Sequence, residues 1–326
     1  MGKNILGIEI GNKRMKIAEF RGGELQDFFT VDIPENMVVD DELIAFEAMG
    51  DLLRETVREN RIRTKKCALV LPDADLYLRS MTMPAMTEKQ LLVNMPYEFK
   101  DILADDKDKY LYDYSLISLD KDENGTVKEM RLLGAVVRKD LIEKYKEMFR
   151  RASLKLIKAA PRETVMSTLI KDLQGGEHKG DFAVLDLGWR TTRVDIFKDG
   201  AYEVTRTIET GAEQIIRAVA ELKGVDPHAA VSYMVQNKDN IQEHESLVDI
   251  YSSIAVEVMR AMNYYAFENP ESTLNTLYYC GGAGSIPRFI REIQDMLDLK
   301  LIPLSDLSNE EKEAVMNGSA AVGICL

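Results

Sequence analysis

Short apolar runs separated by turn residues recur in both halves of the chain. Residues 5–10 and 183–187 are almost continuously apolar, and residues 14–20 and 192–197 follow them as second apolar stretches. Runs of about four to eight apolar residues bounded by turn signals are typical of buried strands. The pattern therefore predicts that each half begins with strands of a sheet.

The same motif joins both strand pairs, at a constant offset. Glu9 of the first copy matches Asp186 of the second, and Gly11 matches Gly188, without a gap. Each copy predicts a buried strand, an acidic-x-Gly tip, a second strand, a glycine turn and a third strand. This shared order of elements favours an internal duplication over chance similarity.

The two tips suggest a specific chemistry. A glycine at a hairpin tip lets the backbone approach a ligand, with N–H groups directed at phosphate oxygens. A carboxylate two residues earlier can hold Mg²⁺ through water. Two such tips facing each other would hold one triphosphate between two domains. The alternative is that both tips are plain hairpins that close a sheet.

Between the two copies lies a block with a different pattern. Thr87 and Gln90 match a capping box that opens a helix toward Leu103. Strand-like stretches surround this helix, and the turn at Asp122–Gly125 predicts a hairpin. Together with a later helix they predict an inserted βαββα subdomain.

In the second half, residues 245–268 predict a long amphipathic helix. A strand and a helix near the C-terminus are joined by the glycine run Gly281–Gly284. The run lacks the third glycine of a dinucleotide-binding motif, and neither a P-loop nor a G-x-S-x-G elbow occurs.

Charge and composition narrow the class of protein. The 326 residues carry 42 Lys and Arg against 55 Asp and Glu, a net charge of -13. Such an excess of acid disfavours binding to nucleic acid or to an anionic membrane surface. No apolar run reaches the length of about 20 residues that a membrane span requires. The three His and three Cys are too dispersed for a metal site, and we expect a reducing cytoplasm.

Taken in order, these motifs resemble the actin, sugar-kinase and Hsp70 superfamily, and within it the PilM family of type IV pilus assembly. The residues that carry the resemblance are Gly7–Gly11, Leu185–Gly188 and Tyr279–Ser285, with Leu71-Pro72 and Met83-Pro84 in the inserted block. The resemblance implies an actin-like α/β fold, a duplicated ribonuclease H-like core with an inserted βαββα subdomain. The expected parts are residues 1–73, first half of domain I; 74–157, inserted subdomain; 158–180, linking helix and hinge; 181–310, domain II; and 311–326, a C-terminal helix returning to domain I.

The resemblance also implies ATP or ADP with Mg²⁺ as a structural or switching ligand. Glu9 and Asp186 would hold the ion through water. The implied nucleotide-binding residues are Glu9, Gly11, Asn12, Lys13, Asp186, Gly188, Thr191, Gly211, Gly281, Gly282 and Gly284.

Several positions depart from the family pattern. Glu9 stands where the family usually carries Asp, and Ala229–Tyr233 lacks the usual Glu and Lys of the adenosine helix. We name no catalytic base and expect at most a weak ATPase. Glu163 lies in the linking helix at a position that faces the cleft in related proteins, but we expect it to be a surface carboxylate here.

In the family, a groove between the inserted subdomain and the first core domain binds the short cytoplasmic N-terminal peptide of PilN, a single-span inner-membrane protein. The resemblance implies a cytoplasmic adaptor that reaches the inner membrane through a PilN-like partner and does not insert into the membrane itself. The sequence does not decide whether the chain associates with further copies of itself. The candidates for lining that groove are Met81, Met83, Tyr97 and Phe99. The alternative is that these side chains form the core of the insert itself.

Three alternatives remain. An FtsA-like division protein would carry an amphipathic C-terminal helix, which is not expected after the core helix that ends at Leu326. A sugar or acetate kinase would need a catalytic Asp or His. The third alternative is a nucleotide-free actin-like scaffold.

Overall fold

The computed structural model describes residues 4–39, 41–103, 106–176, 180–309 and 311–326. Residues 177–179 of the expected hinge and residue 310 at the end of the expected domain II lie outside the described residues. The chain divides into two compact units, Met1–Met166 with Gly323–Leu326 and Ser167–Val322. It passes from the first unit to the second inside helix α4 (Arg162–Leu173).

The first unit is built on a five-stranded mixed sheet in the order β10-β6-β1-β2-β3. Its central strand β1 pairs antiparallel with β2, where Ile8 lies opposite Ile17, and parallel with β6. Helices α1 and α3 contribute Leu53, Tyr145 and Phe149 to the core that covers the sheet. The bounds are β1 Ile5–Ile10, β2 Arg14–Arg21, β3 Glu24–Asp32, α1 Phe46–Glu59, β6 Lys66–Leu71, α3 Lys139–Arg151 and β10 Lys155–Pro161, with a small hairpin of β4 Val38–Val39 and β5 Glu42–Leu43.

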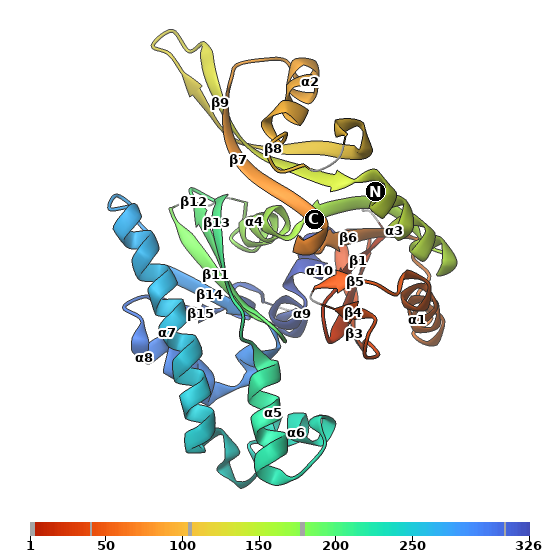
Figure 1. Cartoon of the computed structure of the whole chain (residues 1–326), viewed down its shortest axis with the longest axis vertical. Coiled ribbons are helices and arrows are strands. Elements are labelled where there is room, and N and C mark those ends of the chain that lie inside the picture. The colour runs from red at the N-terminus through yellow and green to blue at the C-terminus, as the bar shows by residue number, and fades with distance from the viewer. Residues whose placement is uncertain (1–3, 40, 104–105, 177–179, 310) are drawn as a thin grey trace. The chain divides into compact units, whose positions relative to one another are not determined.

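The second unit repeats this sheet in the order β13-β12-β11-β14-β15 (Figure 1). Its central strand β11 again has an antiparallel neighbour on one side and a parallel neighbour on the other. The same order and the same directions confirm the duplicated core that the sequence motif predicted. The bounds are β11 Phe182–Leu187, β12 Thr192–Lys198, β13 Ala201–Ile208, β14 Thr276–Cys280 and β15 Lys300–Pro303.

Helices complete the core of the second unit. Helix α7 has the predicted bounds, Glu245–Glu268, and packs against α8, where the rings of Tyr251 and Phe289 lie 5.3 Å apart. The expected single C-terminal helix is instead two short ones, interrupted at Gly318, a residue type with low helix propensity. No helix among the described residues is both long and apolar enough to cross a membrane. The bounds are α5 Ala212–Lys223, α6 Pro227–Val235, α8 Pro287–Met296, α9 Lys312–Asn317 and α10 Ser319–Gly323.

The inserted subdomain has its own antiparallel sheet, in the order β7-β9-β8, with α2 on one face (Figure 1). The predicted capping box is present, because Gln90 N–H donates to Thr87 Oγ1 and Thr87 N–H donates to Gln90 Oε1. Helix α2 ends at Glu98, short of Leu103, soon after Pro96, whose ring and missing N–H weaken a helix. The bounds are β7 Leu76–Pro84, α2 Glu88–Glu98, β8 Tyr110–Lys121 and β9 Val127–Arg138.

The last two elements of the expected block, α3 and β10, take part in the core of the first unit. Strand β10 pairs parallel with β6, and α3 packs against α1 in the same core. A parallel pair needs a crossover, normally a helix, and α3 is that crossover. The separate inserted sheet therefore lies between β6 and α3 in the chain, and residues 139–157 belong to the core sheet and its helix rather than to the insert.

One buried carboxylate connects three segments at the start of the second sheet. Asp181 accepts hydrogen bonds from Ser272 Oγ at 2.7 Å, Thr273 N–H at 3.0 Å and Asp199 N–H at 3.2 Å. Burial opposes the charge of Asp181, but these hydrogen bonds outweigh it and lower the pKa of the carboxyl below its ordinary value.

We expect Asp181→Asn to lower the free energy of unfolding at pH 7 by about 1–3 kcal/mol, because an amide cannot accept from all three donors. The folded-state pKa lies below the unfolded one, so the contribution of Asp181 is complete above about pH 5 and is lost as the pH falls through the folded pKa. Urea denaturation from pH 7 to pH 3 should show the gap between the two proteins narrowing below about pH 4. A gap that is constant with pH would contradict this account.

Candidate functional site

The first tip closes the β1–β2 hairpin. Gly11 N–H donates to the carbonyl of Arg14 at 3.1 Å. Asn12 donates to the carboxylate of Asp41, and Lys13, half-buried in the same turn, accepts from Ile33 N–H through its carbonyl at 2.9 Å. The first unit thus brings Glu9, Gly11, Asn12 and Lys13 together at one end of β1.

Glu9, the proposed Mg²⁺ ligand of this tip, is held by two cations. It lies opposite Lys16 in the antiparallel register, and Lys16 Nζ is 2.8 Å from Glu9 Oε1. Arg162 Nη1 is 3.8 Å from the same oxygen. Among the described residues, no group donates a hydrogen bond to the other oxygen, Oε2, and none form a cluster of three or more metal-ligating side chains.

The first turn of helix α4 carries two buried charged residues. The sequence analysis predicted the helix but not the burial of these charges. Arg162 and Glu163 are both buried, and the expectation that Glu163 is a surface carboxylate is wrong. The first turn of this helix continues directly from the edge strand β10 of the sheet. A charged pair at a helix start gives no sequence signal of burial, because such residues are normally solvated.

The second tip repeats the first in its backbone. Gly188 N–H donates to the carbonyl of Thr191, again at 3.1 Å. Here helix α5 begins against the tip, since Ala212 N–H donates to the carbonyl of Gly188 at 3.0 Å and Glu213 N–H to that of Trp189 at 2.8 Å. The side chain of Trp189 packs on the core of the unit.

Gly211 caps α5 where no side chain would fit, because a Cβ there would lie 2.6 Å from the carbonyl oxygen of Trp189. Because Ala212 N–H and Glu213 N–H donate to the second tip, the first amides of α5 are already engaged by the protein. A helix N-terminus binds anions through such amides when they are unsatisfied.

The glycine run lies beside the second acidic residue. Gly281 has a φ of 95°, and a Cβ on it would lie 2.6 Å from Asp186 Oδ1 and 2.6 Å from the carbonyl oxygen of Leu187. Gly282 is exposed, and its Cβ would meet no atom within 4 Å. With Gly284, these residues form a short 3₁₀ turn after β14. The second unit thus brings together Asp186, Gly188, Thr191, Gly211, Gly281, Gly282 and Gly284 at the ends of β11 and β14.

Two lysines from neighbouring elements lie near the ring of Tyr233 in helix α6, the helix whose sequence departs from the expected family pattern. Lys223 Nζ lies 5.7 Å and Lys238 Nζ 5.1 Å from the ring centre of Tyr233. Lys223 also pairs with Asp239 at 2.8 Å. The sequence analysis missed both lysines, because one precedes the helix and the other follows it.

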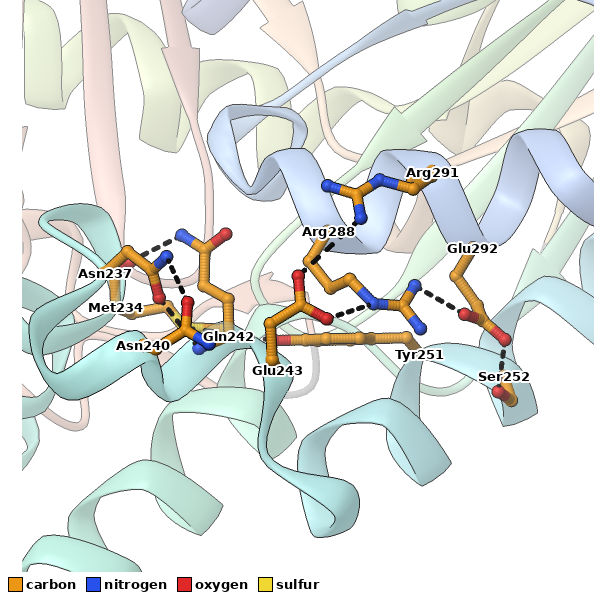
Figure 2. Close-up of polar contacts among 10 residues, drawn as sticks. All are labelled: Met234, Asn237, Asn240, Gln242, Glu243, Tyr251, Ser252, Arg288, Arg291 and Glu292. Carbon is orange, nitrogen blue, oxygen red and sulfur yellow. Dashed lines mark hydrogen bonds and ion pairs between the residues drawn. The ribbon is translucent and has the colours of Figure 1, made fainter.

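The segment between α6 and α7 is fastened to α8 by a polar network (Figure 2). Arg288, in the first turn of α8, donates to Glu243 at 2.9 Å and to Glu292 at 2.6 Å, and Ser252 Oγ donates to Glu292 at 2.6 Å. The bond to Glu292 is the main cause of the raised pKa of Arg288. Burial opposes the charge of Glu292, but the bonds from Ser252 and Arg288 outweigh it and lower the pKa of the carboxyl.

At the start of the same segment, directly after α6, the backbone is left-handed at Asn237, Asp239 and Asn240. Asn and Asp tolerate this conformation better than most residues. Asn237 and buried Gln242 stabilise it, since Gln242 N–H donates to Asn237 Oδ1 and Gln242 Nε2 donates to the carbonyl of Met234 (Figure 2). The network therefore fixes α8, and with it the end of the glycine run, to the α6–α7 connection.

The four candidate partner-binding residues separate into two groups. Met81, Met83 and Phe99 are buried in the core of the insert, which is one of the two expectations stated for them. Tyr97 is 55% exposed, with Lys107 Nζ 4.8 Å from its ring centre. Leu92 and Val93 of α2 are exposed as well.

Two units built on the same five-stranded sheet, each with a glycine-closed hairpin beside its central strand, define an actin-like protein. The family model described as "Type IV pilus assembly protein PilM" matches residues 7–314. The chain therefore belongs to the PilM family of type IV pilus assembly proteins, as its motifs predicted.

Solved structures agree with this fold. The chain is similar to a PilM-PilN type IV pilus biogenesis complex, with 17% identity, 100% of this chain and 98% of that chain covered, and a TM-score of 0.83. It is also similar to the ethanolamine utilization protein EutJ from Carboxydothermus hydrogenoformans, with 13% identity, coverages of 100% and 90% and a TM-score of 0.62. It is similar as well to an archaeal actin homologue, with 12% identity, 99% of this chain and 98% of that chain covered, and a TM-score of 0.52. No curated protein sequence matches the chain.

The neighbouring glycines Gly281 and Gly282 offer a matched pair of variants. We expect Gly281→Ala to lower the free energy of unfolding by about 2–3 kcal/mol, because the new Cβ meets backbone and the φ is positive. Gly282→Ala should change it by less than about 0.5 kcal/mol, since the space beside it is open. Urea denaturation of both variants would measure this, and equal effects would show that the glycine run is not packed as described.

Two arginines that share Glu243 test the network of Figure 2. We expect Arg288→Gln to cost about 2 kcal/mol of unfolding free energy, because the side chain is 16% exposed and its loss leaves Glu292 with a weaker partner. Arg291→Gln, at a side chain 60% exposed, should cost less than about 0.5 kcal/mol. Thermal and urea unfolding would distinguish the two, and a larger effect at Arg291 would contradict the assignment.

Proposed function

We propose that the chain is a cytoplasmic adaptor of a type IV pilus assembly machine, binding the cytoplasmic segment of a PilN-like single-span inner-membrane protein. The observation that carries the proposal is the PilM family match over residues 7–314. The similar structure of a PilM-PilN complex, which aligns with the whole chain, supports the choice of partner.

The surface of the inserted subdomain suits such a partner. Its helix α2 exposes Leu92, Val93 and Tyr97, and exposed apolar groups that gather on one element commonly mark binding sites. Strand β8 lies at the edge of the inserted sheet and could accept an extended segment by strand addition. We therefore assign partner binding to the insert, residues 76–138.

Charge supports the same partner. The cytoplasmic flanks of inner-membrane spans are enriched in Lys and Arg. The chain carries a net charge of -13, so a basic juxtamembrane segment would be attracted to it while anionic lipid would repel it.

A nucleotide is the second ligand of the proposal. The two glycine tips and the glycine run after β14 are the elements that would contact ATP or ADP, as a structural or switching ligand. We assign no catalytic base and at most weak hydrolysis. A nucleotide-free scaffold is the alternative, and one observation favours it: the first amides of α5 already donate to the second tip.

Tyr97 tests the adaptor proposal. We expect Tyr97→Ala to weaken binding of a synthetic N-terminal peptide of the partner roughly tenfold or more, because exposed tyrosines are frequent interface hot spots. Fluorescence anisotropy with a labelled peptide would measure the affinity. Phe267→Ala is the matched control, since Phe267 is 79% exposed on α7 and should leave binding unchanged.

If the unmodified chain binds none of the cytoplasmic peptides of membrane proteins encoded beside it, the adaptor proposal is wrong. If the peptide binds but Tyr97→Ala has no effect, the exposed side of α2 is not the site.

A further inference from the structure

The first tip contains a compact group of opposite charges, all within the first unit. Glu9 Oε1 lies 2.8 Å from Lys16 Nζ and 3.8 Å from Arg162 Nη1. The side chain of Glu9 is 14% exposed and that of Arg162 is 7% exposed. Solvent therefore screens these charges only weakly, and they interact more strongly than a surface ion pair would.

This arrangement does not fit a magnesium ion at Glu9. An ion beside the carboxylate would approach both cations, and like charges repel strongly at such distances when they are poorly solvated. The longer side chain of Glu, compared with Asp, carries its carboxylate to these partners. Among the described residues, no further carboxylates join Glu9 in a metal-binding cluster.

The geometry points to another role for the tip: Lys16 and Arg162 supply the positive charge that a metal would supply, so that a phosphate group binds there without Mg²⁺. The inference rests on the nucleotide ligand proposed above. Arg and Lys are the side chains that bind phosphate through charge-assisted hydrogen bonds. Glu9 holds both cations in place beside Gly11 and competes with the phosphate for them.

Calorimetric titration with ATP, once with Mg²⁺ and once with EDTA, tests this directly. We expect the affinity of the unmodified chain to agree within about threefold between the two conditions, a difference smaller than one lost charge-assisted contact would cause. Binding that requires Mg²⁺ would overturn the inference and leave the nucleotide ligand standing.

Glu9→Gln separates the two roles of the carboxylate. If Glu9 competes with phosphate for the cations, its removal should raise the affinity for ATP in EDTA by roughly threefold to tenfold. If Glu9 is a Mg²⁺ ligand, the same variant should bind Mg-ATP more weakly than the unmodified chain, and the inference would be wrong.

Arg162→Gln is the complementary variant. It should lower the affinity in EDTA roughly tenfold and make binding dependent on Mg²⁺, because the carboxylate is then less neutralised. Arg14→Gln is the control on the same hairpin, where Arg14 is half exposed and pairs with Asp32 at 3.0 Å, and it should bind as the unmodified chain does. Thermal unfolding would check that each variant is folded. If Arg162→Gln does not fold, the Glu9→Gln variant still tests the inference, because Gln has nearly the same shape as Glu.

Absence of heat with ATP in both conditions would overturn the nucleotide ligand and this inference together. The adaptor proposal would be unaffected, because peptide binding tests it separately.

Discussion

The fold depends on a hairpin turn that glycine closes beside the central strand of each sheet. Gly11 and Gly188 donate to the carbonyls of Arg14 and Thr191, both at 3.1 Å. This bond fixes the register of the antiparallel pair, which places Glu9 opposite Lys16 in the first sheet. In the second sheet it presents the carbonyls of the turn to the first amides of α5, so that the helix begins against the tip.

The two copies have kept this backbone and changed what surrounds it. In the first copy the acidic residue is a Glu that reaches two cations, one of them brought by α4. In the second it is the shorter Asp186, which lies against Gly281, where no larger residue would fit. The first acidic residue is thus paired with two cations, and the second packs closely against a glycine. The duplication therefore explains the fold of both sites, whereas the chemistry of each has to be derived from its own neighbours.

Local patterns in the sequence were sufficient for much of the fold. The motif around Gly11 and Gly188 predicted the duplicated sheets, and apolar periodicity predicted α7 with its observed bounds. Long-range pairing was harder, because nothing near β10 in the sequence indicates that it lies parallel to β6. The same holds for the candidate site: the glycine positions were visible, but the approach of Arg162 to Glu9 joins segments far apart in the chain.

The inserted sheet can interrupt the core because its two ends meet. Leu76 of β7 lies opposite Val137 of β9, so the chain leaves the core and returns to it at the same place. Both residues pack with the core of the first unit, and the Tyr145 hydroxyl donates to Asp75 at the root of the insert. Farther out, the sheet and α2 enclose a separate core around Met95. An insert with its own core and an anchored base can therefore change its surface without disturbing the sheet that carries Glu9.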